Sequence, residues 1–204
     1  MTGALDAIEL LAVMRSQRAC RAFRDEPVSD DLLATVLEAA TCAPSAENRQ
    51  PWEFVVVRDP LRRAEIGALI LRAWEGGGRE FAAARLEPGL LEDVDAGARG
   101  GVASAPVHVV VAADLERGLE QTIGSSMFPA VQNLLLAATA LGLGSVLTTI
   151  ATAFAAELAA LVALPPHVRP VAVVPIGWPA RSLGPGRRAP FAEHTAREQY
   201  GTPW

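Results

Sequence analysis

The chain has no lysine, and all 18 of its cationic side chains are arginine. Any phosphate site in this protein must therefore use guanidinium groups or backbone amides rather than the point charge of lysine. Cysteine is also scarce, because Cys20 and Cys42 are the only two. They are too few for a disulfide framework and are not spaced as a CxxC pair, which fits a reducing cytoplasm. We expect both to be buried packing residues.

The amino terminus lacks a basic region followed by an apolar run and a small-residue cleavage site, so we expect no signal peptide. Residues 121–156 contain no charged side chain, and a stretch of that length could cross a bilayer. Pro129, Gln132 and Asn133 interrupt it, which favours a buried central helix over a membrane span. Gly142 is suited to cap that helix, which we expect to begin near Pro129. We therefore expect a cytoplasmic protein.

Several motifs of known chemistry are missing. No strand is followed by GxGxxG, and there is neither a GxxxxGK[ST] loop nor a GxSxG elbow. His108, His167 and His194 have no metal-ligand spacing, and His108 is interpreted as a satisfied core residue of an apolar strand. The net charge is −5 and the arginines are scattered, so the sequence predicts no nucleic-acid surface. These absences disfavour a dinucleotide fold, a serine hydrolase and a metal enzyme.

Length and composition fit one domain over residues 1–204, since half of the residues are hydrophobic and can bury a sizeable core. Hydrophobic periodicity predicts helices that alternate with buried strands, which implies a sheet layered between helices. Ser29 reads as the N-cap of the second helix. The expected helices are one through Leu5, Ile8, Leu11 and Ala12, one from Ser29 to about Cys42, and then 61–81, 129–141 and 154–164; the expected strands are 54–57, 107–112, 145–149 and 170–176.

The segment from about 74 to 101, here called the cover segment, carries several glycines, a Pro88-Gly89 turn and scattered acids. These features describe either a mobile cover over a site or an ordinary surface excursion, and the residues themselves favour neither.

The segment APSAENRQPW connects the second expected helix to the first expected strand. Pro44 and Pro51 restrict the backbone and push the residue before each toward an extended conformation. Ser45, Asn48 and Gln50 can each donate and accept hydrogen bonds, which suits a planar heterocycle with carbonyls and ring nitrogens along one edge. The alternative interpretation is a polar connection with an Asx or Ser cap.

Four arginines, Arg15, Arg18, Arg21 and Arg24, recur every three residues. On a continuing helix they would form a slanted, solvated stripe. If the helix instead ends near Gln17, the residues that follow can turn inward and present two guanidinium groups to a phosphate through bidentate hydrogen bonds.

Five pieces of the chain, in order from about Arg15 to Pro190, resemble the nitroreductase family of FMN enzymes. The pieces are RACRAF from Arg18, APSAENRQPWEFVVV from Ala43, PAVQNLLLAATALGLGSVLTT from Pro129, PIGWPA from Pro175 and GRRAP from Gly186. The resemblance implies an α+β fold of three layers, α/β/α, with a central, mostly antiparallel sheet flanked by helices. It further implies an intertwined homodimer with FMN at the subunit interface and the 43–52 loop reaching the partner's flavin. The uncharged central helix would then be the buried dimer core.

The resemblance also implies the FMN-binding residues. Arg18, Ala19 and Arg21 would hold the phosphate and ribityl chain, and Arg187 and Arg188 would return to the phosphate. The family often has serine at the position of Ala19, so the phosphate grip would rest more on Arg188. The remaining positions are Pro44, Ser45, Asn48 and Gln50 in the loop, Ser126, Met127 and Pro129 on the central helix, and Leu147, Thr148 and Thr149 in a turn where a backbone amide approaches flavin N5.

The implied activity is transfer of hydride from NADH or NADPH through flavin N5 to a small acceptor such as a nitroaromatic or a quinone, in a ping-pong cycle. Because the flavin carries this chemistry, no catalytic side chain and no metal are expected. Two alternatives stay open: a dehalogenase or flavin-fragmenting member of the family, and a non-catalytic protein that sequesters FMN. The residues do not indicate the acceptor or the preferred nicotinamide nucleotide.

Overall fold

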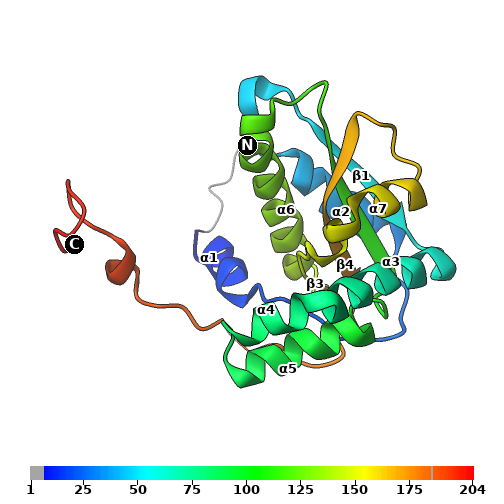
Figure 1. Ribbon diagram of the computed structural model, residues 1–204. Helices are drawn as coiled ribbons and strands as arrows, with labels where there is room; N and C mark the ends of the chain where they lie inside the picture. The colour runs from blue at the N-terminus through cyan, green and yellow to red at the C-terminus, as the bar shows by residue number, and fades with distance from the viewer. Residues whose placement is uncertain (1–6, 185) are drawn as a thin grey trace.

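The computed structural model describes residues 7–184 and 186–204 and is built around one antiparallel sheet (Figure 1). The strands lie in the order β1-β2-β4-β3. Their bounds are Trp52–Val57 for β1, Val107–Asp114 for β2, Gly144–Ser145 for β3 and Val168–Gly177 for β4. Strand β2 is wholly buried and pairs with β1 on one side and β4 on the other, with a bulge between Val111 and Ala112.

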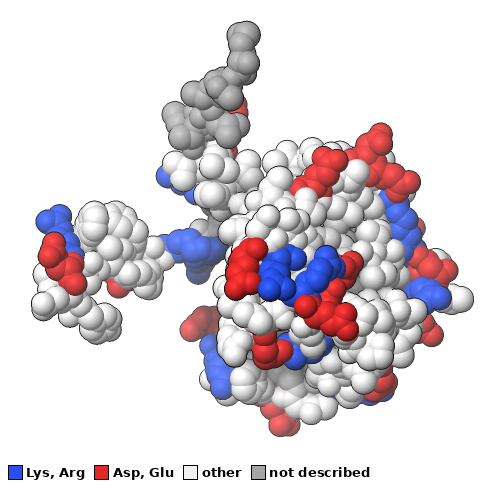
Figure 2. Space-filling model, turned by 90° about the horizontal axis from the view of Figure 1, so that it is seen from above, with Lys and Arg blue, Asp and Glu red and all other residues white. Residues whose placement is uncertain are grey.

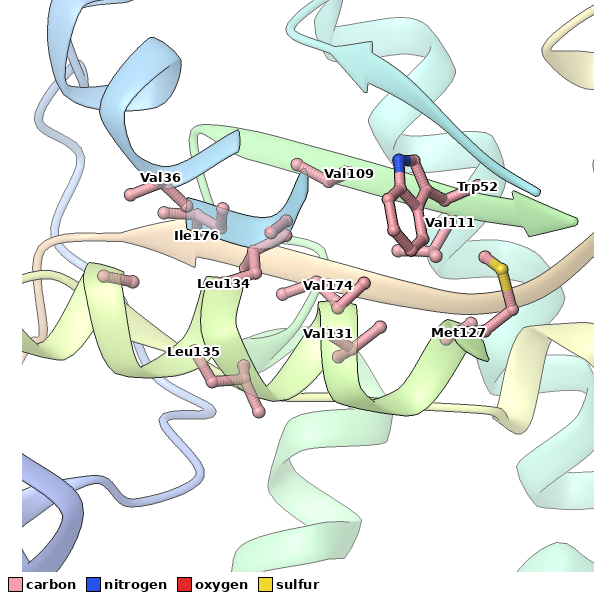
Figure 3. Packing of buried hydrophobic residues seen from close by; sticks show 14 of the residues in the cluster. Val36, Trp52, Val109, Val111, Met127, Val131, Leu134, Leu135, Val174 and Ile176 are labelled. Carbon is pink, nitrogen blue, oxygen red and sulfur yellow. The ribbon is translucent and has the colours of Figure 1, made fainter. Parts of the chain in front are cut away.

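Helices cover both faces of the sheet. Because successive strand residues point to opposite faces, Val109 and Val174 pack with α2 (Asp30–Thr41) and α6 (Ile123–Ala140), as Figure 3 shows. Their neighbours Val110 and Val173 pack on the other face. That face is covered by α3 (Pro60–Ala73), α5 (Pro88–Ala96) and α7 (Ala155–Leu161). The predicted three-layer arrangement with a mostly antiparallel sheet is confirmed.

The central helix α6 begins earlier than expected. It starts at Ile123, so Pro129 lies inside the helix rather than in its first turn. The buried stripe of Met127, Val131 and Leu134 runs past the proline, and its packing outweighs the backbone hydrogen bond that proline cannot donate. The predicted cap is confirmed, because Gly142 has a φ of 77° and the amides of residues 142 and 143 return to the carbonyls of 139 and 138.

Other boundaries differ from the expectations. The strand expected over 145–149 is only the short β3, followed by an isolated bridge between Thr148 and Val173. The helix expected over 154–164 begins as a 3₁₀ turn at Ile150–Phe154 and ends at Leu161. Helix α1 (Ala7–Ser16) ends before Arg18, as the inward-turning alternative requires; Leu5 lies outside the described residues. Ser29 is the N-cap of α2, and its Oγ accepts from the Leu32 amide at 3.4 Å.

The cover segment is helical. A π-helical turn (Trp74–Gly78) links α3 to α4 (Arg79–Ala83), and α5 continues into a second π-helical turn (Gly97–Gly101). Asp95 ties these pieces together, because its carboxylate accepts from Trp74 Nε1 at 2.8 Å, from Arg79 Nε at 3.2 Å and from Arg99 Nε at 3.0 Å. The structure therefore shows an ordered helical layer where the sequence left two interpretations open.

After β4 the chain first packs against the body, where Arg181 pairs with Asp93 and Leu183 packs on a small core cluster. Figure 1 then shows the carboxy-terminal tail running away to one side, through a short 3₁₀ turn at Phe191–His194 and on to the carboxy terminus. Its aromatic residues Phe191, Tyr200 and Trp204 are exposed. On the face in Figure 2, arginines lie beside acidic residues rather than in a block. Among the described helices, none is both long and apolar enough to cross a membrane.

Candidate functional site

Arg21 opens onto a cavity of about 200 Å³ between the sheet layer and the cover segment. The other lining residues are mostly apolar: Ile70, Val94, Ala98, Val102, Val146, Leu147, Thr148, Thr149 and Ile150. The Arg21 side chain is only 22% exposed, and burial lowers the pKa of its guanidinium while Asp93 opposes that shift. This volume is below the roughly 300–1,000 Å³ of pockets that enclose a whole ligand. The cavity thus suits one edge of a flat, largely apolar ligand.

The hydrogen bonds of Thr148 and Thr149, in the turn at 147–149, differ. The Thr148 amide donates to the Val173 carbonyl at 3.0 Å, and the Val173 amide donates back at 2.9 Å. The Thr148 hydroxyl accepts from the Ile150 amide at 3.3 Å. Within the described parts of the chain, the amide of exposed Thr149 has no hydrogen-bond acceptor. Of the two threonines expected beside flavin N5, Thr149 is therefore the one with an amide available to a ligand.

Arg18 and Arg188 lie next to each other around Gly186. A Cβ added at Gly186 would lie 3.0 Å from Arg188 Nη1 and 3.4 Å from Arg18 Cδ. Arg18 Nη1 also donates to the Gly184 carbonyl at 3.0 Å, and Arg188 Nη1 donates to the Arg187 carbonyl at 2.8 Å. Arg187 itself is exposed. The structure therefore places two exposed guanidinium groups where they can approach a common anion.

Arg18 and Arg21 do not face the same cavity, contrary to the expectation that they present two guanidinium groups to one phosphate. Arg18 lines a separate hollow of about 380 Å³ together with Arg24 and Arg181. The reason is the extended backbone between them: half-buried Ala19 bridges Ser145 like a strand residue, so side chains three residues apart point to opposite sides.

Both cysteines were expected to be buried, which is confirmed for Cys20 and wrong for Cys42. Cys20 is buried, its thiol donates to the Ala22 carbonyl at 3.3 Å, and burial raises the thiol's pKa. Cys42 is exposed, because it is the C-cap of α2 rather than part of its buried face.

The loop from exposed Pro44 to Gln50 is held by hydroxyl groups. Ser45 Oγ accepts from the Gln50 amide at 3.0 Å, and Ser126 Oγ, from α6, accepts from the Ala46 amide at 3.2 Å. The Gln50 side-chain amide donates to Asn48 Oδ1 at 3.1 Å. Gln50 was expected to be extended before Pro51, but its φ is 48°, since the bond to Ser45 closes the loop. The loop is pre-organised and its amides are exposed.

Two expected flavin-facing residues of α6 have other roles in this chain. The Met127 side chain is fully buried in the core beneath the sheet, so it cannot contact a ligand there. The buried Ser126 hydroxyl is used by the 44–50 loop. Pro129 is half-buried on the same helix.

The predicted site residues form separate groups. Arg21 meets Leu147, Thr148 and Thr149 in a cavity whose wall residues Ile70, Ala98, Val102 and Val146 pack on one face of the sheet. The 44–50 loop meets Ser126 near the amino-terminal end of α6, which packs on the other face. One chain therefore does not bring the loop and the Arg21 cavity together.

Sequence reasoning missed Asp93 and Arg181. Asp93 Oδ2 lies 3.6 Å from Arg21 Nη1, and its other oxygen pairs with Arg181. The signal was present as a period of four in the cover segment, since Asp93 and Gly97 fall on one helical face and Gly101 follows four residues later.

His108 was expected to be a satisfied core residue, and this is only half correct. It is fully buried, and its Nε2 bonds the Val102 carbonyl at 3.0 Å. Its Nδ1 has no partner among the described residues. Burial, with a smaller contribution from nearby Arg63, lowers the pKa of His108 to about 4, although the hydrogen bond to Val102 opposes the shift.

Residues 14–178 match the model of the Nitroreductase family, which covers most of the chain. The segment with Arg187 and Arg188 lies beyond that range. A Thermus thermophilus protein named NADH dehydrogenase is 33% identical over 206 residues, covering 94% of this chain and 97% of the relative. A Rhodospirillum rubrum protein named 5,6-dimethylbenzimidazole synthase is also 33% identical, covering 82% of this chain and 81% of the relative.

The fold is similar to that of nitroreductase A from Vibrio parahaemolyticus, with a TM-score of 0.75 and 21% identity, covering 94% of this chain and 76% of that structure. The two 33% relatives carry different names, so identity at this level does not fix the reaction. The family model, the relatives and the shared fold agree on one conclusion: the chain belongs to the nitroreductase family of oxidoreductases.

Proposed function

We propose that the protein is an FMN-dependent oxidoreductase that takes hydride from NADH or NADPH and delivers it to a small acceptor such as a nitroaromatic or a quinone. The observation that carries the proposal is the cavity in which Arg21 and Thr149, whose amide has no acceptor among the described residues, meet apolar walls. Bound FMN would supply the hydride chemistry, and the chain would supply binding, orientation and charge.

The residues present fit such a group. Apolar walls from Val102, Val146 and Leu147 suit the flat ring system, and Arg21 supplies positive charge at one edge. Arg18 and Arg188 can bind a phosphate by bidentate hydrogen bonds, and both are exposed. The Thr149 amide would donate a hydrogen bond that orients the ring.

The complete site would need two copies of the chain. In one chain the 44–50 loop lies at the amino-terminal end of α6 and the Arg21 cavity lies on the other face of the sheet, so Ser45, Asn48 and Gln50 would serve the partner's cavity. The chain also exposes large apolar side chains beside α6. Leu10, Leu11 and Met14 of α1 and Phe128 of α6 are 45–50% exposed. A homodimer would bury this surface.

The test is an anaerobic absorption spectrum of the purified protein before and after addition of NADPH and then NADH. A visible flavin band that either nucleotide bleaches supports a flavin reductase and identifies the donor. A colourless protein that takes up no added FMN contradicts the proposal.

A second candidate is a protein that stores flavin without turning over. The ordered cover segment favours it, because Val94, Ala98 and Val102 wall the cavity from one side. A bound flavin that neither nucleotide bleaches would select this candidate. Loss of the flavin band with formation of new products under oxygen would instead select the flavin-fragmenting alternative, and turnover of haloaromatic compounds would select a dehalogenase.

A further inference from the structure

Three positions of the cover segment meet Arg21 along its whole length. Asp93 Oδ2 lies 3.6 Å from Nη1 of Arg21. A Cβ added at Gly97 would lie 2.8 Å from Arg21 Cδ, and one added at Gly101 would lie 2.1 Å from the Arg21 carbonyl oxygen. The contacts run in order from the guanidinium through the stem to the backbone. The spacing of four residues places Asp93 and Gly97 on one helical face, and Gly101 follows after Gly100, whose φ of 145° breaks the helix.

The adjacent face of the same helix shapes the cavity. Val94, Ala98 and Val102 each follow one of the Arg21 contacts by one residue, and all three line the 200 Å³ cavity. The cover segment therefore both contacts Arg21 and forms one wall of the cavity that Arg21 lines. A shift of this segment would therefore move Arg21 and the cavity wall together.

Charge at this point is balanced by one carboxylate. Within residues 7–184 and 186–204, Asp93 is the acidic partner of Arg21, and it is shared with Arg181 from the segment after β4. Asp93 is 37% exposed and Arg21 is 22% exposed, so solvent screens the pair only in part. The charge that a ligand meets at the cavity edge depends on this carboxylate.

We propose that Asp93 is a positioning residue that seats the Arg21 guanidinium at the flavin edge and offsets its charge, and so sets how strongly the site favours reduced over oxidised FMN. The proposal rests on the proposed function, since it needs FMN in this cavity. It assigns a role in cofactor tuning to the cover segment.

The first experiment measures the midpoint potential of the bound flavin. Asp93→Asn removes one negative charge beside Arg21, so reduced FMN, which carries more negative charge, is favoured about tenfold more, a rise of about 30 mV for a two-electron couple. Glu92→Gln is the matched control, because Glu92 is the preceding residue of α5 and is exposed. An unchanged potential in Asp93→Asn, or an equal shift in Glu92→Gln, would overturn the proposal.

The second experiment needs no flavin. A double-mutant cycle of Asp93→Asn and Arg21→Gln in urea unfolding should give a coupling of at least threefold in the unfolding equilibrium constant. Additive effects would show that Asp93 does not hold Arg21 and would overturn the proposal. If the wild-type protein binds no FMN, the proposed function and the tuning role both fall, while this cycle still decides whether the contact exists.

Two glycine substitutions test whether the cover segment positions the Arg21 side chain, without removing any charge. Gly97→Ala pushes the flexible Arg21 stem aside and should weaken FMN binding severalfold in a fluorescence titration. Gly89→Ala makes the same substitution in α5 where nothing lies within 4 Å, and it should leave the affinity unchanged. Equal affinities for wild type and Gly97→Ala would contradict the claim that this contact positions Arg21 for FMN binding.

Discussion

The 44–50 loop end and the Arg21 cavity end of the site residues differ in what they offer a ligand. At the loop end, beside the amino terminus of α6, the 44–50 loop projects exposed amides from a backbone that is strained and held by two serine hydroxyls. At the cavity end, on the other face of the sheet, Arg21 and Thr149 lie in a hollow with apolar walls. One end is a set of polar groups without a cavity around them, and the other is a cavity with few polar groups.

We propose from this difference that the two ends are complementary halves of a site in a homodimer. A flavin has both a flat apolar ring system and an edge of hydrogen-bonding groups, and neither end of one chain satisfies both. The apolar α1 face and the extended tail give the chain surface with which to pair. Pairing of two chains in this way would explain why a single chain carries both halves yet keeps them apart.

The largest effect is expected at the cavity end. Arg21→Gln should weaken FMN binding by about 10- to 100-fold, because a hydrogen bond to a charged group contributes about 1.5–3 kcal/mol. Fluorescence titration of apoprotein with FMN measures the loss. Arg169→Gln is the control, since Arg169 pairs with exposed Glu120 and contacts neither half. Similar affinities for the two variants would show that Arg21 has no specific part in FMN binding, and the cavity would lose its proposed role.

Acid should loosen the cavity end before the loop end. The folded-state pKa of His108 is about 4, below its ordinary value of 6.5, so the unfolded chain binds more protons between these values. Stability is therefore complete above about pH 6.5 and falls as the pH drops toward 4, by about 2 kcal/mol between pH 6.5 and 5. Urea unfolding at several pH values measures this slope.

His108→Gln tests the assignment of that slope. Its stability should change less between pH 7 and 5 than that of the wild type, because it carries no group that titrates there. Hydrogen exchange at pH 5 should rise first near Val102, whose carbonyl bonds the His108 ring. An equal slope in both proteins would exclude His108 as the cause.

At the loop end, Asn48 and Glu47 form a matched pair. Both are exposed and have φ values of 54° and 53°, so glycine relieves the same backbone strain at either position. Asn48→Gly also removes the amide and should weaken FMN binding about 3- to 10-fold, as for the loss of one hydrogen bond. Glu47→Gly should leave the affinity within twofold. If both variants bind alike, the Asn48 side chain has no part in the site.

The smallest effect is expected for Arg188→Ala. Its guanidinium is exposed, so a phosphate contact there is screened and should contribute only about a 2- to 5-fold change in FMN affinity. That change should shrink further at high salt, and the fold should be unaffected. Equal flavin occupancy in mutant and wild type at low salt would remove Arg188 from the site.

Much of the fold could be predicted because its signals are local. The Ser29 cap, the Gly142 turn and the mostly apolar run of β2 each depend on residues close in sequence. The start of α6 could not be predicted from Pro129, because tertiary packing of Met127 and Val131 overrides the local cost of a proline. The strand predicted over 145–149 ends at Ser145, and of the four residues that follow only Thr148 pairs with β4. The sequence does not signal this early end.

The site was predicted less completely than the fold. Short motifs that resemble those of the nitroreductase family predicted Arg21, Thr149 and the 44–50 loop as FMN-binding residues. The structure shows that these residues form separate groups within one chain. Which threonine amide is available depends on the bridge to Val173, and the roles of Asp93 and Gly97 depend on how the cover segment packs. Such contacts between distant segments leave little trace in local sequence.

The central claim, that each site is completed by two chains, is tested most directly by mixing two defective variants. One chain carries Arg21→Gln and the other carries Asn48→Gly with Gln50→Ala, and the mixed dimer is purified through two different affinity tags. If the loop of one chain serves the cavity of the other, the mixed dimer regains one FMN site of wild-type affinity and leaves one with both defects. If the mixed sample binds FMN only as weakly as its two parents, the site lies within one chain and the account is wrong.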